Sequence, residues 1–321
     1  MENAYPPPFS FRTFKERTVM LELFLHLLLL FGLSPLLPGV IGKTKALFAG
    51  RTGPPLLQSY YDLWKLFSKG LVISRTTTWI FRAGPVLGLA VPVLAALLVP
   101  FGSIGAPLAF TGDLIFFVYL FGLSRFFTAS AALDTGSSFE GMGAAREVTF
   151  SCLAEPTVFF CFIVLARLSG SLSLDTMFGP ALNAAWQSAG PSLILVLACL
   201  FVVVLVENCR IPFDDPNTHL ELTMIHEVMV LDHSGPDFGM ILYGAAMKLF
   251  VLGALVVRLV FPGATGNVLF DTLLFCGGML LLAVVIGVVE STMARLRLLR
   301  VPQLLVGTML LSFFSLILLL R

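Results

Sequence analysis

Charged residues are scarce in this sequence. Only 12% of its 321 residues are Asp, Glu, Lys or Arg, 57% are apolar, and the mean hydropathy is +0.95. So few charges cannot cover the surface of a soluble chain of this length, which excludes an ordinary soluble protein. Twenty basic residues nearly balance nineteen acidic ones, so the composition also excludes a nucleic-acid-binding protein and a disordered one.

Several sequence patterns are also missing. The alternating pattern of a β-barrel is absent, and so are a phosphate-cradling loop, a Ser/His/Asp set and a haem motif. No two cysteines have C-x-x-C spacing, and all fall in or beside apolar runs, which is typical of small hydrophobic residues. The cysteines are Cys152, Cys161, Cys199, Cys209 and Cys276. We therefore expect a non-catalytic chain that holds no metal or cofactor of its own.

Most of the sequence consists of apolar runs of about 20 residues, which is the length of a helix that crosses a bilayer. They predict an all-α, polytopic membrane protein with eight transmembrane helices. The expected spans lie near 19–38, 79–100, 113–134, 147–168, 190–211, 238–261, 268–290 and 302–320. Residues 1–18 are polar and are expected to form an extramembrane leader, with residues 19–321 forming a single membrane domain.

The distribution of basic residues predicts the orientation. Positive charges concentrate between the first two spans and before the last, and such loops lie on the cytoplasmic side. The residues are Lys43, Lys45, Arg51, Lys65, Lys69, Arg75 and Arg82 in the first loop, and Arg295, Arg297 and Arg300 in the last. Both termini are then expected on the outer side, although Arg12, Lys15 and Arg17 favour the opposite.

The first of these loops also contains an amphipathic pattern. Apolar side chains recur every three or four residues at Leu56, Tyr60, Trp64, Phe67 and Leu71. This spacing predicts a helix lying in the membrane interface and anchored by aromatic residues. Packing against soluble protein is the alternative, but the chain offers little soluble protein for it.

Charged residues at membrane depth need a reason, because each is costly unless paired, neutral or hydrated. Glu155 lies about eight residues, or roughly 12 Å, into the fourth span. Glu207 lies one turn from the end of the fifth span, and Lys248 near the middle of the sixth. A buried lysine with no acid nearby would be deprotonated, so we expect Lys248 to have a carboxylate partner.

The loop after the fifth span is acidic. It carries Asp214, Asp215, Glu221, Glu227, Asp232 and Asp237 against Arg210. Neighbouring carboxylates can share protons, so the loop could gather and relay them. A solvated loop that contacts a basic partner is an equally good interpretation.

Three histidines in this region, His219, His226 and His233, recur every seven residues. On one helix they would be about 10.5 Å apart, too far to share one zinc ion with Zn–N distances of about 2 Å. A polar stripe at a protein interface is the better interpretation.

Three longer motifs resemble those of a known family. They are AGRTGPPLLQSYYDLWKLFSKG (49–70), LDTGSSFEGMGAAREVTFSCLAEP (133–156) and VENCRIPFDDPNTHLEL (206–222). They are similar to the motifs of the membrane "subunit 1", or H-type, family of respiratory complex I, which is shared with membrane-bound [NiFe] hydrogenases and formate hydrogenlyases. The resemblance covers essentially the whole chain and implies a membrane anchor beneath a hydrophilic redox arm.

The resemblance also implies roles for individual residues. The implied proton path includes Glu155, Glu207, Asp214 and Glu221, which match the family's motifs. The charge pattern described above adds Asp215, Glu227 and Lys248 to the predicted path. The implied charge partners are Arg146, Glu147, Arg210 and Asp134, and the implied docking surface for the arm includes Arg51, Asp62 and Lys65. Asn217 and His219 stand where complex I usually has acids, and LDTGSS resembles the hydrogenase branch, so quinone use is doubtful.

The function implied is that of an integral membrane subunit of a complex I-like hydrogenase or formate hydrogenlyase, coupling electron transfer to proton or sodium translocation in the cytoplasmic membrane of a prokaryote. The expected partners are hydrogenase-like large and small subunits with their [NiFe] centre, an iron-sulfur protein and antiporter-like membrane subunits. Alternatives are a quinone-chamber subunit of a complex I-type oxidoreductase, a purely structural anchor in which the buried acids only satisfy Arg146, Arg210 and Lys248, and an autonomous ion transporter.

Overall fold

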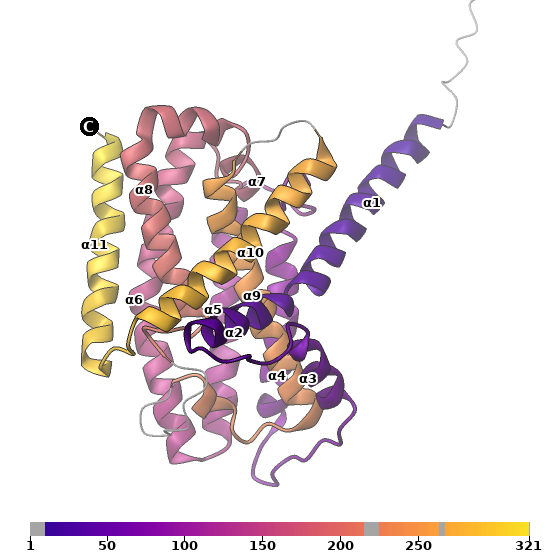
Figure 1. Ribbon diagram of the computed structural model, residues 1–321, viewed down its shortest axis with the longest axis vertical. Helices are drawn as coiled ribbons and strands as arrows, with labels where there is room; N and C mark the ends of the chain where they lie inside the picture. Colours follow the sequence, from indigo (N-terminus) through magenta and orange to yellow (C-terminus); the bar gives the residue numbers. More distant parts are fainter. Residues whose placement is uncertain (1–9, 215–224, 263–266, 321) are drawn as a thin grey trace, which may run out of the picture.

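The computed structural model describes the backbone of residues 10–214, 225–262 and 267–320, and side chains from residue 20 onward. Every regular element in these ranges is helical (Figure 1). The elements are α1 (Ser10–Leu33), α2 (Leu36–Phe48), α3 (Gln58–Phe67), α4 (Trp79–Ala96), α5 (Asp113–Asp134), α6 (Ser138–Ser169), α7 (Leu174–Met177), α8 (Ala181–Glu207), η1 (Glu227–Val230), α9 (Gly235–Val260), α10 (Val268–Thr292), η2 (Leu298–Arg300) and α11 (Val301–Leu320).

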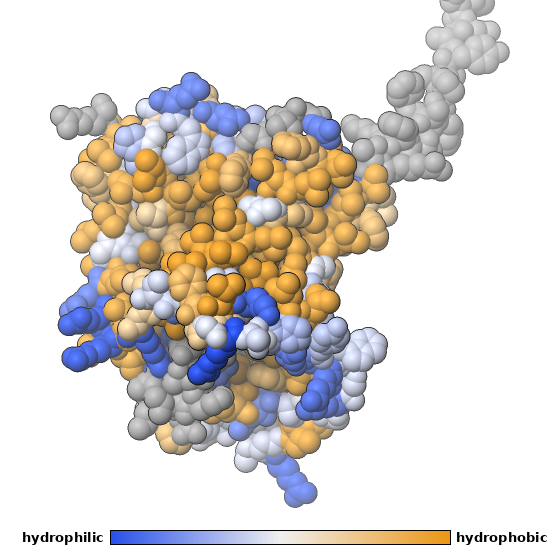
Figure 2. Space-filling model, viewed as in Figure 1, coloured by the Kyte–Doolittle hydropathy of each residue, from blue (hydrophilic) through white to orange (hydrophobic). Residues whose placement is uncertain are grey.

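Eight segments of the described chain are long and apolar enough to cross a membrane, as the sequence predicts. Figure 2 shows a broad hydrophobic belt between hydrophilic ends, the pattern expected of a multi-pass membrane protein. The segments that follow α2, α5 and α10 all lie in the lower half of Figure 1. We call this the loop end; it carries most of the basic residues.

The first span differs from its expected bounds. The chain bends at Ser34 and Pro35 and then continues as α2 to Phe48, whereas the sequence predicts a span ending near residue 38. Proline disfavours helical backbone at the residue before it, which explains the break. Lys43 and Lys45 therefore lie on a helix and not in a loop, and α1 extends away from the other helices (Figure 1).

Two other spans also begin earlier than expected. Helix α6 starts at Ser138, so Glu147 lies on the same continuous helix as Glu155. Helix α8 starts at Ala181 and is kinked at Ala189, two residues before Pro191, and it ends at Glu207. Arg210 consequently lies in the segment that follows α8.

Residues 58–67 form a helix, as the apolar spacing predicts, although Leu56 and Leu71 lie outside it. Helix α3 packs against α2 and α9 and buries none of its residues completely, and Trp64 is 80% exposed. Its position in a membrane interface stays a prediction.

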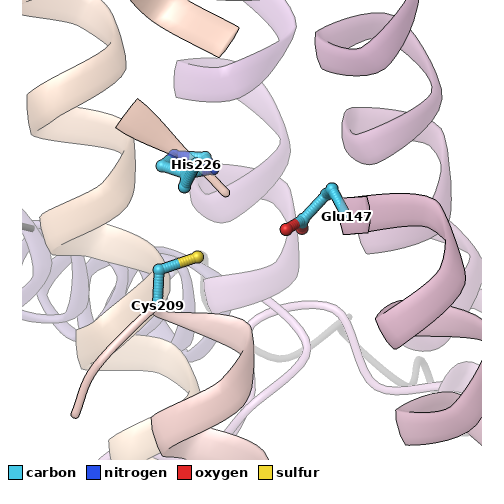
Figure 3. A group of neighbouring side chains, drawn as sticks. All are labelled: Glu147, Cys209 and His226. Carbon is cyan, nitrogen blue, oxygen red and sulfur yellow. The ribbon is translucent and has the colours of Figure 1, made fainter. Parts of the chain in front are cut away.

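The segments on either side of residues 215–224 pack against the helices, and η1 contacts α5 and α6. Residues 208–214 follow α8, and residues 225–234 lead through η1 into α9. They bring Cys209 and His226 to face Glu147 of α6 (Figure 3).

Candidate functional site: a buried charge cluster beside a cavity

A cavity of about 300 Å³ opens among α4, α5 and α9 near the loop end. One part of its wall is apolar and includes Gly88, Phe121 and Leu242. The other part is ionisable, and its members are Asp62, Arg125, Glu147, Glu207, Cys209, Arg210, Asp214, His226, Glu227, His233 and Lys248. Ligand-binding pockets in proteins commonly combine an apolar lining with a few polar groups in this way.

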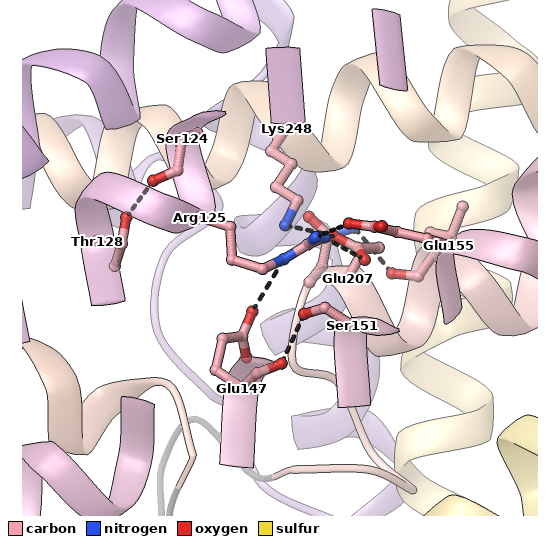
Figure 4. Close-up of polar contacts among 10 residues, drawn as sticks. Ser124, Arg125, Thr128, Glu147, Ser151, Glu155, Glu207 and Lys248 are labelled. Atoms are coloured by element: carbon pink, nitrogen blue, oxygen red, sulfur yellow. Dashed lines mark hydrogen bonds and ion pairs between the residues drawn. The ribbon is translucent and has the colours of Figure 1, made fainter. Parts of the chain in front are cut away.

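Arg125, near the middle of α5, is at the centre of the charged part (Figure 4). Its guanidinium donates to Glu155 of α6 in a close contact, and Nη2 donates to both carboxylate oxygens of Glu207 at 2.7 and 2.9 Å. Its Nε lies 3.9 Å from Glu147. The planar fork of donors suits arginine for such multiple contacts.

Lys248 of α9 completes this cluster. Its ammonium lies 2.8 Å from Glu207 Oε2, so the structure supplies the carboxylate partner that its depth requires. We call Arg125, Glu147, Glu155, Glu207 and Lys248 the charge cluster. It joins α5, α6, α8 and α9, so four separate spans meet at one set of ion pairs.

The two cations of the charge cluster face three carboxylates, so the fully ionised set has a net charge of 2 − 3 = −1. Adding one proton makes it neutral, which a low-dielectric environment favours. Glu207 is held by both cations and Glu155 by the closest arginine contact, whereas the printed contact of Glu147 is 3.9 Å. Glu147 is therefore the carboxylate held least tightly.

Arg125 was missed in the sequence, although the signal was present. It is a charged residue in the middle of an apolar span, and the rule that singled out Lys248 applies equally to it. The structure also reveals Glu290 at the end of α10, whose side chain is fully buried. It lies 2.9 Å from Lys45 and 3.5 Å from Arg210, so Arg210, which the sequence placed beside the acidic loop, pairs with α10.

Other predicted residues lie outside the charge cluster. Asp214 is buried, lies 2.8 Å from Arg295, and accepts hydrogen bonds from the backbone N–H groups of Ile225 and His226. It therefore fixes the loop segments in place. Glu227 lines the cavity, whereas Asp215 and Glu221 lie outside the described residues.

The predicted charge partners Asp134 and Arg146 lie on α5 and α6. Asp134 accepts from the backbone N–H of Thr78 at 2.6 Å and from its hydroxyl at 3.0 Å, which links the end of α5 to the start of α4. Arg146 is half-buried on α6. The expected docking residues Arg51, Asp62 and Lys65 are all exposed at the loop end.

The cavity wall also contains a set of metal-ligating residue types. A carboxylate oxygen of Glu147, the sulfur of Cys209 and a ring nitrogen of His226 all lie within 4.8 Å of one another (Figure 3). Burial and the nearby Glu147 carboxylate raise the pKa of the Cys209 thiol well above its ordinary value, and burial lowers the pKa of His226. At neutral pH both side chains are therefore uncharged in the metal-free chain.

Comparisons with known proteins agree with this architecture. The family model described as NADH dehydrogenase matches residues 21–320. The chain is 33% identical to formate hydrogenlyase subunit 4 of Escherichia coli (strain K12), over 84% of this chain and 89% of the relative. It is 32% identical to hydrogenase-4 component C of the same organism, over 82% and 84%.

A solved structure shares the fold. The match lies in the membrane-bound sulfane sulfur reductase, described as an archaeal respiratory membrane complex, with a TM-score of 0.79 and 21% identity over 94% of this chain and 99% of that one. The family match over nearly the whole chain, two relatives above 30% identity and the shared fold lead to one conclusion: this chain belongs to the NADH dehydrogenase family, the membrane subunit 1 family of respiratory complex I.

Proposed function

We propose that this chain is the integral membrane subunit of a complex I-like hydrogenase or formate hydrogenlyase. It docks a hydrophilic [NiFe] and iron-sulfur arm at the loop end and couples electron transfer in that arm to proton movement. The expected location is the cytoplasmic membrane of a prokaryote, with both termini on the outer side. The names of the two bacterial relatives support the hydrogenase assignment.

The charge cluster is the observation that carries the coupling role. It holds an unbalanced carboxylate inside the membrane-spanning helices and borders a cavity near the loop end. Electron transfer in a docked arm changes the potential at the cavity, and protons on these acids respond to that potential. Protons enter at Glu147, which is held least tightly, and pass through the other two acids.

In this scheme, protons leave the charge cluster through Glu155. Its side chain is 39% exposed on the surface of the isolated chain, whereas that of Glu207 is 9% exposed. A carboxylate exposed to lipid at this depth is costly. A partner membrane subunit that covers Glu155 removes this cost and receives the proton, which fits the antiporter-like partners that the resemblance implies.

A quinone-reactive subunit is the second candidate. The size and lining of the cavity favour it, whereas the replaced acids at two positions argue against it. A volume of about 300 Å³ with an apolar wall is at the lower end of the size of small-molecule sites. The acids expected along the complex I path are replaced at Asn217 and His219, which lie outside the described residues.

Co-purification from the native membrane tests the proposal. The tagged chain is isolated in mild detergent, its partners are identified by mass spectrometry, and nickel and iron are measured. The proposal predicts a hydrogenase-like large subunit with both metals. Iron without nickel, with NADH-oxidising subunits, supports the quinone-reactive candidate, and a chain isolated alone contradicts both.

A charge-reversal pair tests the docking end. Replacing Arg51 and Lys65 by Glu should reduce recovery of the soluble arm by more than about tenfold, a loss of about 1.4 kcal/mol in binding, while the membrane partners stay bound. Arg167→Glu is the matched control, because Arg167 is exposed near the opposite end of α6. Equal loss of the arm in the control would contradict docking at the loop end.

A further inference from the structure

Glu147, Cys209 and His226 come from three separate parts of the chain. Glu147 lies on α6, Cys209 lies two residues after the end of α8, and His226 directly precedes η1. Their donor atoms nevertheless lie within 4.8 Å of one another at the cavity wall. In tetrahedral zinc sites donor atoms are about 3.5 Å apart. Side-chain movements of about 1 Å would therefore close the group around one ion.

His226 has a buried atom without a partner. Its Nδ1 is inaccessible to solvent and makes no hydrogen bond within the described part of the chain. A buried polar atom without a partner typically costs about 1–3 kcal/mol. The backbone of His226 is held independently, because its N–H donates to Asp214 at 3.3 Å. The backbone that carries the ring is therefore fixed, while Nδ1 of the ring is left for another ligand.

The types and charges of the three donors select a class of metal. A thiolate, an imidazole and a carboxylate suit Zn²⁺ and related divalent transition metals, and they do not suit Mg²⁺ or Ca²⁺. A divalent cation with one thiolate, one carboxylate and a neutral imidazole has zero net charge, so the occupied group avoids the penalty of a buried charge.

We propose that Glu147, Cys209 and His226 form a site for a divalent cation of the Zn²⁺ class, with its fourth coordination position open to the cavity. On binding, the Cys209 S–H bond breaks, a sulfur–metal bond forms and the proton leaves through the cavity to solvent. No electron is transferred. The fourth position takes water or a donor atom of a molecule in the cavity.

Occupancy would also remove Glu147 from proton transfer, since the metal holds its carboxylate. This consequence rests on the proposed function, in which Glu147 is the entry to the charge cluster. Metal binding itself does not depend on that function and can be measured on the full chain alone.

The first experiment uses the purified full chain in detergent, stripped with a chelator and titrated with Zn²⁺ against a colorimetric zinc indicator. We expect one Zn²⁺ per chain. Cys209→Ser and His226→Gln should each weaken binding by more than about tenfold, the lower end of the loss caused by removing even an outer-shell partner. The matched control Cys152→Ser, at an exposed cysteine outside the cavity, should bind as the unchanged chain does.

X-ray absorption at the zinc edge of the unchanged chain removes any dependence on how the variants fold. The site predicts one sulfur at about 2.3 Å and nitrogen or oxygen ligands at about 2.0–2.2 Å. No stoichiometric binding, ligation without sulfur, or binding that Cys209→Ser and His226→Gln leave unchanged would each overturn the proposal.

The consequence for coupling needs the assembled complex. Zn²⁺ should lower coupled proton movement, and Cys209→Ser should restore it in the presence of the metal. If the chain binds Zn²⁺ through sulfur but coupling is unaffected, the metal site stands and the role of Glu147 in proton entry fails.

Discussion

At the scale of single residues, Arg125 has the largest effect on the site. It is the common partner of Glu147, Glu155 and Glu207, and its side chain is only 11% exposed. Removing one partner of a buried ion pair leaves the other charge uncompensated and typically costs about 3–5 kcal/mol. The arginine therefore links three spans, α5, α6 and α8, and stabilises the charges of the three acids.

Replacing Arg125 should destabilise the protein in a graded way. We expect Arg125→Leu to lower the thermal unfolding temperature strongly, since it leaves Lys248 as the remaining cation of the charge cluster. Arg125→Lys keeps the charge but cannot contact several carboxylates with a planar fork, so an intermediate loss is expected. The measurement is thermal unfolding in detergent, and equal stability of both variants and the unchanged chain would contradict the structural role.

His233 should make stability depend on pH. Its ring stacks on Phe81 at 3.9 Å, and burial lowers its pKa from 6.5 to about 4. Between these values the unfolded chain binds a proton that the folded chain does not, so this contribution is fully present above pH 6.5 and is lost as the pH falls toward 4.

The variant His233→Phe, which keeps a stacking ring, should reduce this dependence. We expect its unfolding temperature to change less than that of the unchanged chain between pH 6.5 and 4. Parallel curves for the two proteins would show that His233 does not titrate as its burial requires.

At the scale of elements, close packing of helices depends on small residues. A Cβ atom added to Gly244 of α9 would lie 2.2 Å from the carbonyl oxygen of Gly88 on α4, far inside van der Waals contact. Glycine at such crossings lets backbones approach, as is common in membrane helices. The contact holds α9, which carries Lys248, against α4 at the cavity.

Gly244→Ala should therefore force α4 and α9 apart and cost about 1–3 kcal/mol, the usual cost of overpacking. Gly88→Ala is the matched control, because a Cβ atom there would have no neighbour within 4 Å. Thermal unfolding of both variants is the measurement. A control that loses as much stability as Gly244→Ala would contradict the packing described.

At the scale of the whole molecule, the sequence predicted the class of fold but not the meeting of distant residues. Apolar run length predicts eight spans because the bilayer imposes that length on each span separately. The limits of spans depend on local features such as the break at Pro35, so the expected bounds of the first, fourth and fifth spans were wrong. The motifs located Glu155, Glu207 and Arg210 but not their partners.

Those partners are set by tertiary packing. The pairing of Arg210 with Glu290, and the approach of Cys209 and His226 to Glu147, depend on how the helices and the segment after α8 are arranged. Spacing along the chain argues against one metal shared by the three histidines. Spacing along the chain does not predict that Glu147, Cys209 and His226 meet, because they come from three separate segments.

Glu155→Gln tests whether the charge cluster relays protons. The intact complex is reconstituted in vesicles, and proton movement is measured beside electron transfer from the soluble arm to an artificial acceptor. We predict an assembled complex with normal electron transfer and proton movement reduced by at least about tenfold, the lower part of the range for loss of a positioned proton-transfer group. Asp232→Asn, at an exposed acid outside the charge cluster, should leave both unchanged. Unimpaired proton movement in Glu155→Gln would contradict the relay, and loss of assembly would support a purely structural anchor.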